Sequence, residues 1–174
     1  MYSRTTNLKN MKGKILAVFI LFSTIYGMAC TDQPEPQNVD VQIISGENFG
    51  FCVGPCYRAL NLNTGDTYLE LEVRSRDSRG SDLADTTIYT DMFSMAELEA
   101  LKEAIPDLET FFALEEVYGC PDCADGGSEF IEINDGLKTH RVTFEYGSSV
   151  KEIEPIIELL RQKRQELIEK YEVY

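Results

Sequence analysis

Four cysteines form two close pairs, Cys52-Val-Gly-Pro-Cys56 and Cys120-Pro-Asp-Cys123, and their thiols carry the most specific chemistry in the domain. In an exported chain, thiols oxidise to disulfides, and four cysteines can be joined in three ways. Two local bridges would each close a very small loop and contribute about 2 kcal/mol. Bridges between the two segments would close about 65 residues and contribute about 4 kcal/mol. Both connectivities are open, and we favour local pairs.

Two other chemistries are open to these thiols. Two cysteine pairs on neighbouring loops suit the tetrahedral coordination of zinc, but the three residues between Cys52 and Cys56 and an oxidising compartment favour disulfides. A thiol–disulfide exchange pair begins a helix, whose N-terminus lowers the thiol pKa. Cys120-Pro-Asp-Cys123 instead runs towards a strand, and Asp122 and Asp125 disfavour a thiolate. We therefore expect structural disulfides, no metal and no other cofactor.

Other residues with catalytic or metal-binding chemistry are sparse. Asp122, Asp125 and Glu129 surround Gly126-Gly127 and could offer oxygen ligands to Ca²⁺, but the spacing is not that of an EF-hand. A tight loop whose acids cap or face water explains them more simply. His140, the only histidine, lies in a predicted strand. Gly-x-Ser-x-Gly, His-Glu-x-x-His and phosphate-binding glycine loops are absent, so we expect no catalytic residue and no enzyme.

The fifth cysteine, Cys30, follows a segment with the features of a secretory signal. Residues 1–29 contain no acid and the basic residues Arg4, Lys9, Lys12 and Lys14. The apolar run Ile15–Phe22 is shorter than the roughly 20 residues of a membrane span. Gly27-Met-Ala-Cys30 is typical of the processing site of bacterial lipoproteins, in which the cysteine is acylated. Ordinary signal cleavage is the alternative, and translation could begin at Met1 or Met11.

These features divide the chain into a lipoprotein signal peptide (1–29), a flexible tether (30–39) and a single domain (40–174). Removing residues 1–29, which hold four of the 16 basic residues and none of the 30 acidic ones, leaves a net charge of −18. Such a surface repels nucleic acid. We expect the lipid bilayer, reached through acylated Cys30, and a protein of the cell envelope as partners. The outer membrane is favoured over the inner one, with the domain facing the periplasm or the exterior.

Two β-hairpins are indicated by alternating apolar and polar residues around turn-forming clusters. The predicted arms are Tyr57–Leu62 and Thr67–Arg74 around Asn63-Thr-Gly-Asp66, and Glu129–Ile133 and Lys138–Tyr146 around Asn134-Asp-Gly136. Val41–Ser45 and Thr86–Thr90 are further candidate strands. Short hairpin connections force antiparallel pairing.

Two helices accompany these strands. Ser94 and Glu97 have the spacing of a capping box, and Pro106 ends the first helix. Lys151–Tyr171 predicts the longest helix, with Pro155 in its first turn. Its charged residues are interpreted as a solvated face: Glu158, Arg161, Lys163 and Glu166. Both helices can bury their apolar stripes on one face of a four- or five-stranded antiparallel sheet, which gives an α+β fold.

Two motifs resemble a family of uncharacterised bacterial lipoproteins. They are Phe49-Gly-Phe-Cys-Val-Gly-Pro-Cys56 and Gly119-Cys-Pro-Asp-Cys-Ala-Asp-Gly-Gly127, each placed before a hairpin. The resemblance covers most of Val41–Leu160 and implies an envelope lipoprotein, but it supplies no activity. Our leading hypothesis is a membrane-tethered, non-enzymatic binding or accessory domain. The alternative is a metal-binding or redox protein that uses the Cys52/Cys56 and Cys120/Cys123 thiols.

Overall fold

The computed structural model describes residues 40–78 and 85–174, which belong to one unit, Val39–Tyr174. The predicted signal peptide, the tether and Cys30 lie outside the described residues. The elements are β1 (Gln42–Asn48), β2 (Gly54–Asn63), β3 (Tyr68–Arg76), β4 (Asp85–Met92), α2 (Met95–Ala104), α3 (Leu108–Phe112), β5 (Val117–Tyr118), η1 (Cys123–Asp125), β6 (Ser128–Asn134), β7 (Thr139–Glu145), η2 (Lys151–Ile153) and α4 (Glu154–Lys170). None of the helices in these residues is long and apolar enough to cross a membrane.

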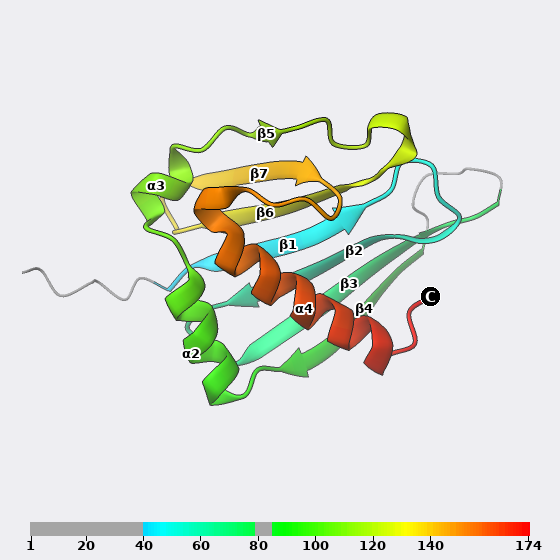
Figure 1. The fold of residues 1–174 in the computed structure, drawn as a ribbon. Helices are drawn as coiled ribbons and strands as arrows, with labels where there is room; N and C mark the ends of the chain where they lie inside the picture. The colour runs from blue at the N-terminus through cyan, green and yellow to red at the C-terminus, as the bar shows by residue number, and fades with distance from the viewer. Residues whose placement is uncertain (1–39, 79–84) are drawn as a thin grey trace, which may run out of the picture. The chain divides into compact units, whose positions relative to one another are not determined.

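The strands form one seven-stranded sheet in the order β4-β3-β2-β1-β6-β7-β5 (Figure 1). β1 pairs antiparallel with β2 on one side and with β6 on the other, so it joins the two predicted hairpins. The α+β class is confirmed, but the prediction of four or five antiparallel strands is wrong. β5 pairs parallel with β7, and at two residues it is too short to show an alternating pattern in the sequence.

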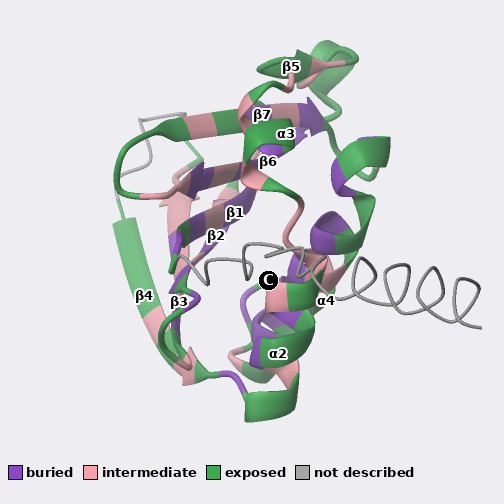
Figure 2. Cartoon of the chain, turned by 90° about the vertical axis from the view of Figure 1, so that its left-hand side faces the viewer, coloured by how far each residue is buried: buried purple, intermediate pink, exposed green. Residues whose placement is uncertain are grey.

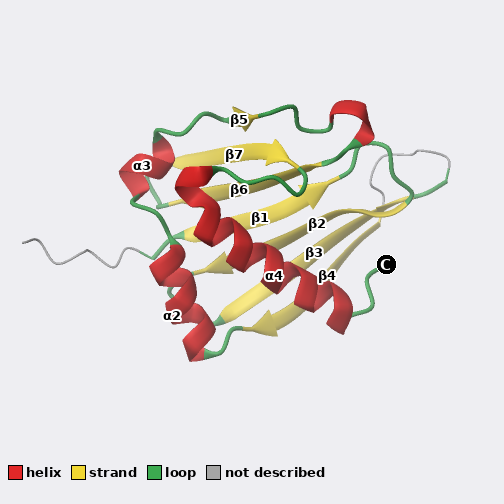
Figure 3. Ribbon diagram, in the orientation of Figure 1, coloured by secondary structure: helices red, strands yellow, loops and turns green. Residues whose placement is uncertain are grey.

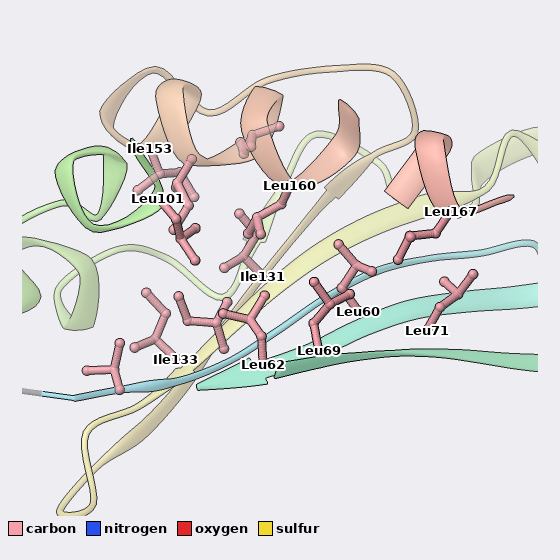
Figure 4. Close-up of a cluster of buried hydrophobic side chains, with 14 of the residues drawn as sticks. Leu60, Leu62, Leu69, Leu71, Leu101, Ile131, Ile133, Ile153, Leu160 and Leu167 are labelled. Atoms are coloured by element: carbon pink, nitrogen blue, oxygen red, sulfur yellow. The ribbon is translucent and has the colours of Figure 1, made fainter. Parts of the chain in front are cut away.

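The helices α2 and α4 lie on one face of the sheet, and the core fills the space between (Figures 2 and 3). Side chains from β1, β2, β3, β6 and β7 meet side chains from α2, η2 and α4 in this layer, part of which Figure 4 shows. The fully buried members include Leu60, Leu69, Leu71, Ile131, Ile133, Leu101, Ile153 and Leu160. Burial of each such side chain stabilises the fold by about 1.5–3 kcal/mol.

No described helix covers the opposite face of the sheet (Figure 2). Phe130 of β6 lies on that face, yet it is only 4% exposed. The ring of Phe130 lies over Gly46 of β1, where an added Cβ would come within 2.9 Å of the Phe130 Cε1 atom. Tyr57 stacks beside Phe130 with a centroid separation of 6.1 Å. Arg141 covers Phe130, with its guanidinium carbon 4.3 Å from the ring centroid. Gly46 thus makes room for an aromatic pair on the open face, and Arg141 shields that pair from solvent.

A capping box begins α2, and its glutamate also contacts α4. The Ser94 hydroxyl accepts the Glu97 N–H at 3.2 Å, and the Glu97 carboxylate accepts the Ser94 N–H at 2.6 Å, as the sequence predicted. The Lys163 ammonium of α4 also donates to the Glu97 carboxylate at 2.6 Å. The Lys163 side chain is only 11% exposed, so its assignment to a solvated face is wrong. The hydrogen bonds from Lys163 and Ser94 lower the pKa of Glu97 from its ordinary 4.5 to about 2.

We expect Glu97→Gln to lower the free energy of unfolding at pH 7 and to flatten its acid dependence. Because the folded-state pKa of Glu97 is depressed, its stabilisation is present above the ordinary pKa of 4.5 and is lost as the pH falls towards about 2. Urea unfolding at a series of pH values measures this contribution. Glu99→Gln is the control, because Glu99 lies exposed on the same helix and pairs with Lys102 of that helix rather than with α4. An unchanged pH slope for Glu97→Gln would contradict the assignment.

Candidate functional site

Both cysteine pairs are closed locally, as we favoured from the sequence. Cys52 is disulfide-bonded to Cys56, with Cα atoms 5.6 Å apart, and Cys120 to Cys123, with Cα atoms 5.5 Å apart. Cys56 is fully buried at the start of β2, whereas Cys120 and Cys123 are exposed. Among the described residues, no group of three or more His, Cys, Asp or Glu side chains is placed to hold a metal ion. The structure therefore does not assemble the alternative zinc site.

The two disulfide loops meet at the end of the sheet where β1 ends and β6 begins (Figure 1). The Gly50 N–H donates to the Asp122 carboxylate at 3.2 Å, across the two loops. A Cβ on Gly127 would come within 2.5 Å of the Phe49 ring, so a glycine there lets the loops pack closely. Phe49 in turn packs edge-on against Tyr146, with centroids 4.9 Å apart. We call this region, residues 49–56 and 119–127, the disulfide end.

The second loop holds three non-glycine residues in the left-handed region: Asp122, Ala124 and Asp125, with φ of 60°, 53° and 61°. Aspartate tolerates this conformation, but alanine adopts it at a cost of about 1 kcal/mol. The Cys120–Cys123 bridge and the hydrogen bond from the Asp122 N–H to the Gly127 C=O hold the loop in this shape. The loop therefore presents a fixed surface.

The first loop presents apolar side chains to solvent. Phe51 is 85% exposed and Val53 is 68% exposed, and they flank the disulfide-bonded Cys52. Arg76 of β3 donates to the Gly50 C=O and supports the loop from beneath. Large exposed apolar side chains on a disulfide-closed loop are typical of contact surfaces, because the loop backbone loses little conformational entropy when it is covered.

Next to the disulfide end, charged side chains are buried between the sheet and α4. Arg58, Glu47 and Glu129 lie side by side on neighbouring strands β2, β1 and β6. Two glutamates directly opposite one another repel. Arg164 of α4, 2% exposed, lies between them, 2.9 Å from the Glu129 carboxylate and 3.3 Å from that of Glu47. Arg58 Nε is 2.7 Å from the Glu47 carboxylate, although not in hydrogen-bond geometry.

Arg161, one turn earlier in α4, completes this Arg–Glu cluster. Its Nε donates to Glu129 at 3.1 Å and its second guanidinium nitrogen to the Ser148 C=O at 2.7 Å. The other Glu129 oxygen accepts the Gly147 N–H at 3.0 Å. A cleft of about 430 Å³ opens beside the cluster. Because the carboxylates are already engaged by arginines, the cluster fixes α4 on the sheet and leaves no free acid–base pair.

Sequence reasoning missed this cluster. Arg164 falls at helical spacing with the buried residues Leu160 and Leu167, and a charged residue on an apolar stripe is the signal that could have found it. Arg161 was interpreted as part of a solvated face, but two-thirds of its side chain is covered. Glu129, weighed as a calcium ligand or a loop acid, is 3% exposed and belongs to the cluster.

The other residues that the sequence offered for catalysis or calcium binding do not come together in one site. His140 of β7 packs edge-on against Phe111 at a centroid distance of 5.7 Å. Its buried Nε2 has no hydrogen-bond partner among the residues that the structure describes. Asp122 accepts from Gly50, and Asp125 lies exposed beyond it. The described residues therefore form neither a histidine-based triad nor a convergent calcium site.

We expect the Cys52→Ala, Cys56→Ala double variant to lose about 2 kcal/mol of unfolding free energy, because the bridge restricts the unfolded chain. The Cys120→Ala, Cys123→Ala variant is the matched comparison, since its loop is similarly small. Guanidinium unfolding and alkylation of unreduced protein measure both. Rapid alkylation of all four cysteines without a reductant would show that the bridges are not formed.

For the Arg–Glu cluster, we expect Arg164→Met to cost about 3 kcal/mol, because the buried Glu47 and Glu129 carboxylates lose the cation that lies between them and keep only Arg58 and Arg161 at their sides. Arg161→Met is the control and should cost about 1 kcal/mol, since that side chain is one-third exposed. Adding Glu129→Gln to Arg164→Met should recover part of the loss. Equal costs for the two single variants would contradict this account of the cluster.

Comparison with known proteins does not assign the chain: no protein-family model matches it, and no curated protein matches it in sequence. The resemblance of its two cysteine motifs to bacterial lipoproteins stays a prediction.

Proposed function

We propose that the protein is an envelope lipoprotein, acylated at Cys30, whose domain binds a partner and does not catalyse a reaction. The small residues before Cys30 support the anchor. The paired cysteines suit an oxidising compartment outside the cytoplasm. Together they support an exported protein held on a membrane by lipid.

The direction of β1 supports a partner site at the disulfide end. The tether would join the domain just before Gln42, which is the first residue of β1. At about 3.3 Å per residue, the seven residues of β1 carry the chain roughly 20 Å to the opposite end of the sheet, where both disulfide loops lie. The disulfide end is therefore the end of the domain farther from the point of attachment.

The observation that carries the binding role is the exposure of Phe51 and Val53 on the disulfide-closed loop. Two exposed apolar side chains on a disulfide-closed loop, next to a polar rim, suit a protein partner with an apolar pocket. Asp122 and Asp125 supply negative charge at the rim. They favour a partner surface that carries basic residues.

A thiol-dependent role is the second candidate, and it is favoured by the exposure of Cys120 and Cys123. The surrounding charge argues against it. The Cys120 N–H donates to the Glu145 carboxylate at 2.7 Å, and Asp122 and Asp125 are adjacent. Negative charge disfavours the thiolate that exchange chemistry needs.

Two measurements test the proposal separately. Labelled fatty acid should be incorporated into the full chain in bacterial cells and be lost in Cys30→Ser, which should also leave the membrane fraction. Lack of incorporation, with an unmodified soluble product, would remove the anchor.

Crosslinking in the envelope should capture a reproducible protein partner with the wild type and much less of it with Phe51→Ser, Val53→Ser. Leu137→Ser is the matched control, because Leu137 is 92% exposed on the β6–β7 turn at the other end of the sheet. Equal capture by both variants would exclude the disulfide end as the binding surface.

A further inference from the structure

The two edges of the sheet differ in how they are protected. One edge ends in β5, a strand of only two residues. The other edge is β4, eight residues long, which pairs with β3 without a register shift from Tyr68–Met92 to Ser75–Asp85. A long regular edge offers backbone groups to another strand, and proteins usually block it with charges, proline or a bulge.

The hydrogen bonds around β4 show which backbone groups face outward. The Phe93 N–H donates to the Thr67 C=O at 2.7 Å, so odd-numbered residues of β4 face β3 and even-numbered residues face away. Two outward groups are already capped. The Tyr171 hydroxyl donates to the Thr90 C=O at 2.7 Å, and the Met92 N–H donates to the Asp91 carboxylate at 2.9 Å.

The centre of this edge is left open. The outward backbone groups here are the N–H and C=O of Thr86 and Ile88 and the N–H of Thr90. None of them has a hydrogen-bond partner within residues 40–78 and 85–174. Between Thr86 and Thr90 the strand has no charged residue, no proline and no bulge, and Ile88 is 55% exposed. The usual protections of a sheet edge are thus missing where its backbone is free.

We propose that β4 pairs antiparallel with β4 of a second copy of this chain, about a two-fold axis at Ile88. The residues whose backbone groups point outward are Thr86, Ile88 and Thr90, and their order is the same from either end of the strand. The edge is therefore complementary to an antiparallel copy of itself. Ile88 exchanges both backbone bonds with its counterpart, and Thr86 does so with Thr90 of the other copy. Threonine–threonine and isoleucine–isoleucine neighbours are favourable cross-strand pairs.

Charge is accommodated at the ends of this pairing. Asp85 of one copy comes opposite Asp91 of the other, and Lys170 lies 2.8 Å from the Asp91 carboxylate to neutralise it. Tyr171 takes one lone pair of the Thr90 C=O and leaves the second for the partner strand. The acidic domains repel as wholes, so this association strengthens as salt rises, whereas pairing with a basic foreign segment would weaken.

Disulfide trapping tests the pairing on the full chain in detergent. In an antiparallel hydrogen-bonded pair the facing Cα atoms are about 5.5 Å apart, which a disulfide can bridge. Ile88→Cys should therefore form a covalent dimer under mild oxidation about tenfold faster than Leu137→Cys, the exposed control at the β6–β7 turn. A mixture of Thr86→Cys with Thr90→Cys should crosslink faster than either variant alone.

Light scattering of the uncrosslinked protein gives an independent readout. Ile88→Pro removes an outward N–H and no bond to β3, so it should weaken self-association about tenfold or more while unfolding as the wild type does. Ile88→Lys, which adds a charge to the edge, serves the same purpose if the proline variant fails to fold. Equal crosslinking of Ile88→Cys and Leu137→Cys, or a monomer at every salt concentration, would overturn the proposal and leave the edge to a strand from another protein.

Discussion

Arg164 is buried between Glu47 and Glu129, and its position determines how α4 lies across the centre of the sheet. Burying charges costs solvation, so such a cluster adds less to stability than its attraction alone suggests. Its value here is geometric, because only one placement of α4 brings Arg164 to both glutamates. Glu47 lies at the end of β1, just before the first disulfide loop. Glu129 lies at the start of β6, just after the second disulfide loop. The disulfide end therefore depends on the same contact.

The sequence predicted those elements whose cause is local. The capping box of Ser94 and Glu97, and the turn at Asn134-Asp-Gly136, need only nearby residues, and both are present. The central position of β1 could not be predicted, because it depends on pairing with β6, more than eighty residues away in the sequence. β5 was missed because two residues carry no period.

The candidate site was predictable to a similar extent. The sequence left the disulfide connectivity open with local pairs favoured, and the structure has the local pairs. The Arg–Glu cluster arises only when β2, β1, β6 and α4 come together, and charged residues on a surface-type helix read as solvated until that packing is known. Arg164, in line with Leu160 and Leu167, was the visible exception to the pattern.

The domain combines a disulfide-closed loop with exposed apolar side chains, an aromatic pair shielded by arginine and a network of engaged charges. The proposed binding role rests on the first of these features. The proposed place of the protein in the cell rests on Cys30. The intact mass of the protein purified from bacterial membranes tests that claim most directly. The account predicts a chain that begins at Cys30, carries acyl chains and gains the mass of four hydrogens on reduction. An unacylated terminus, or free thiols with a bound metal, would contradict it.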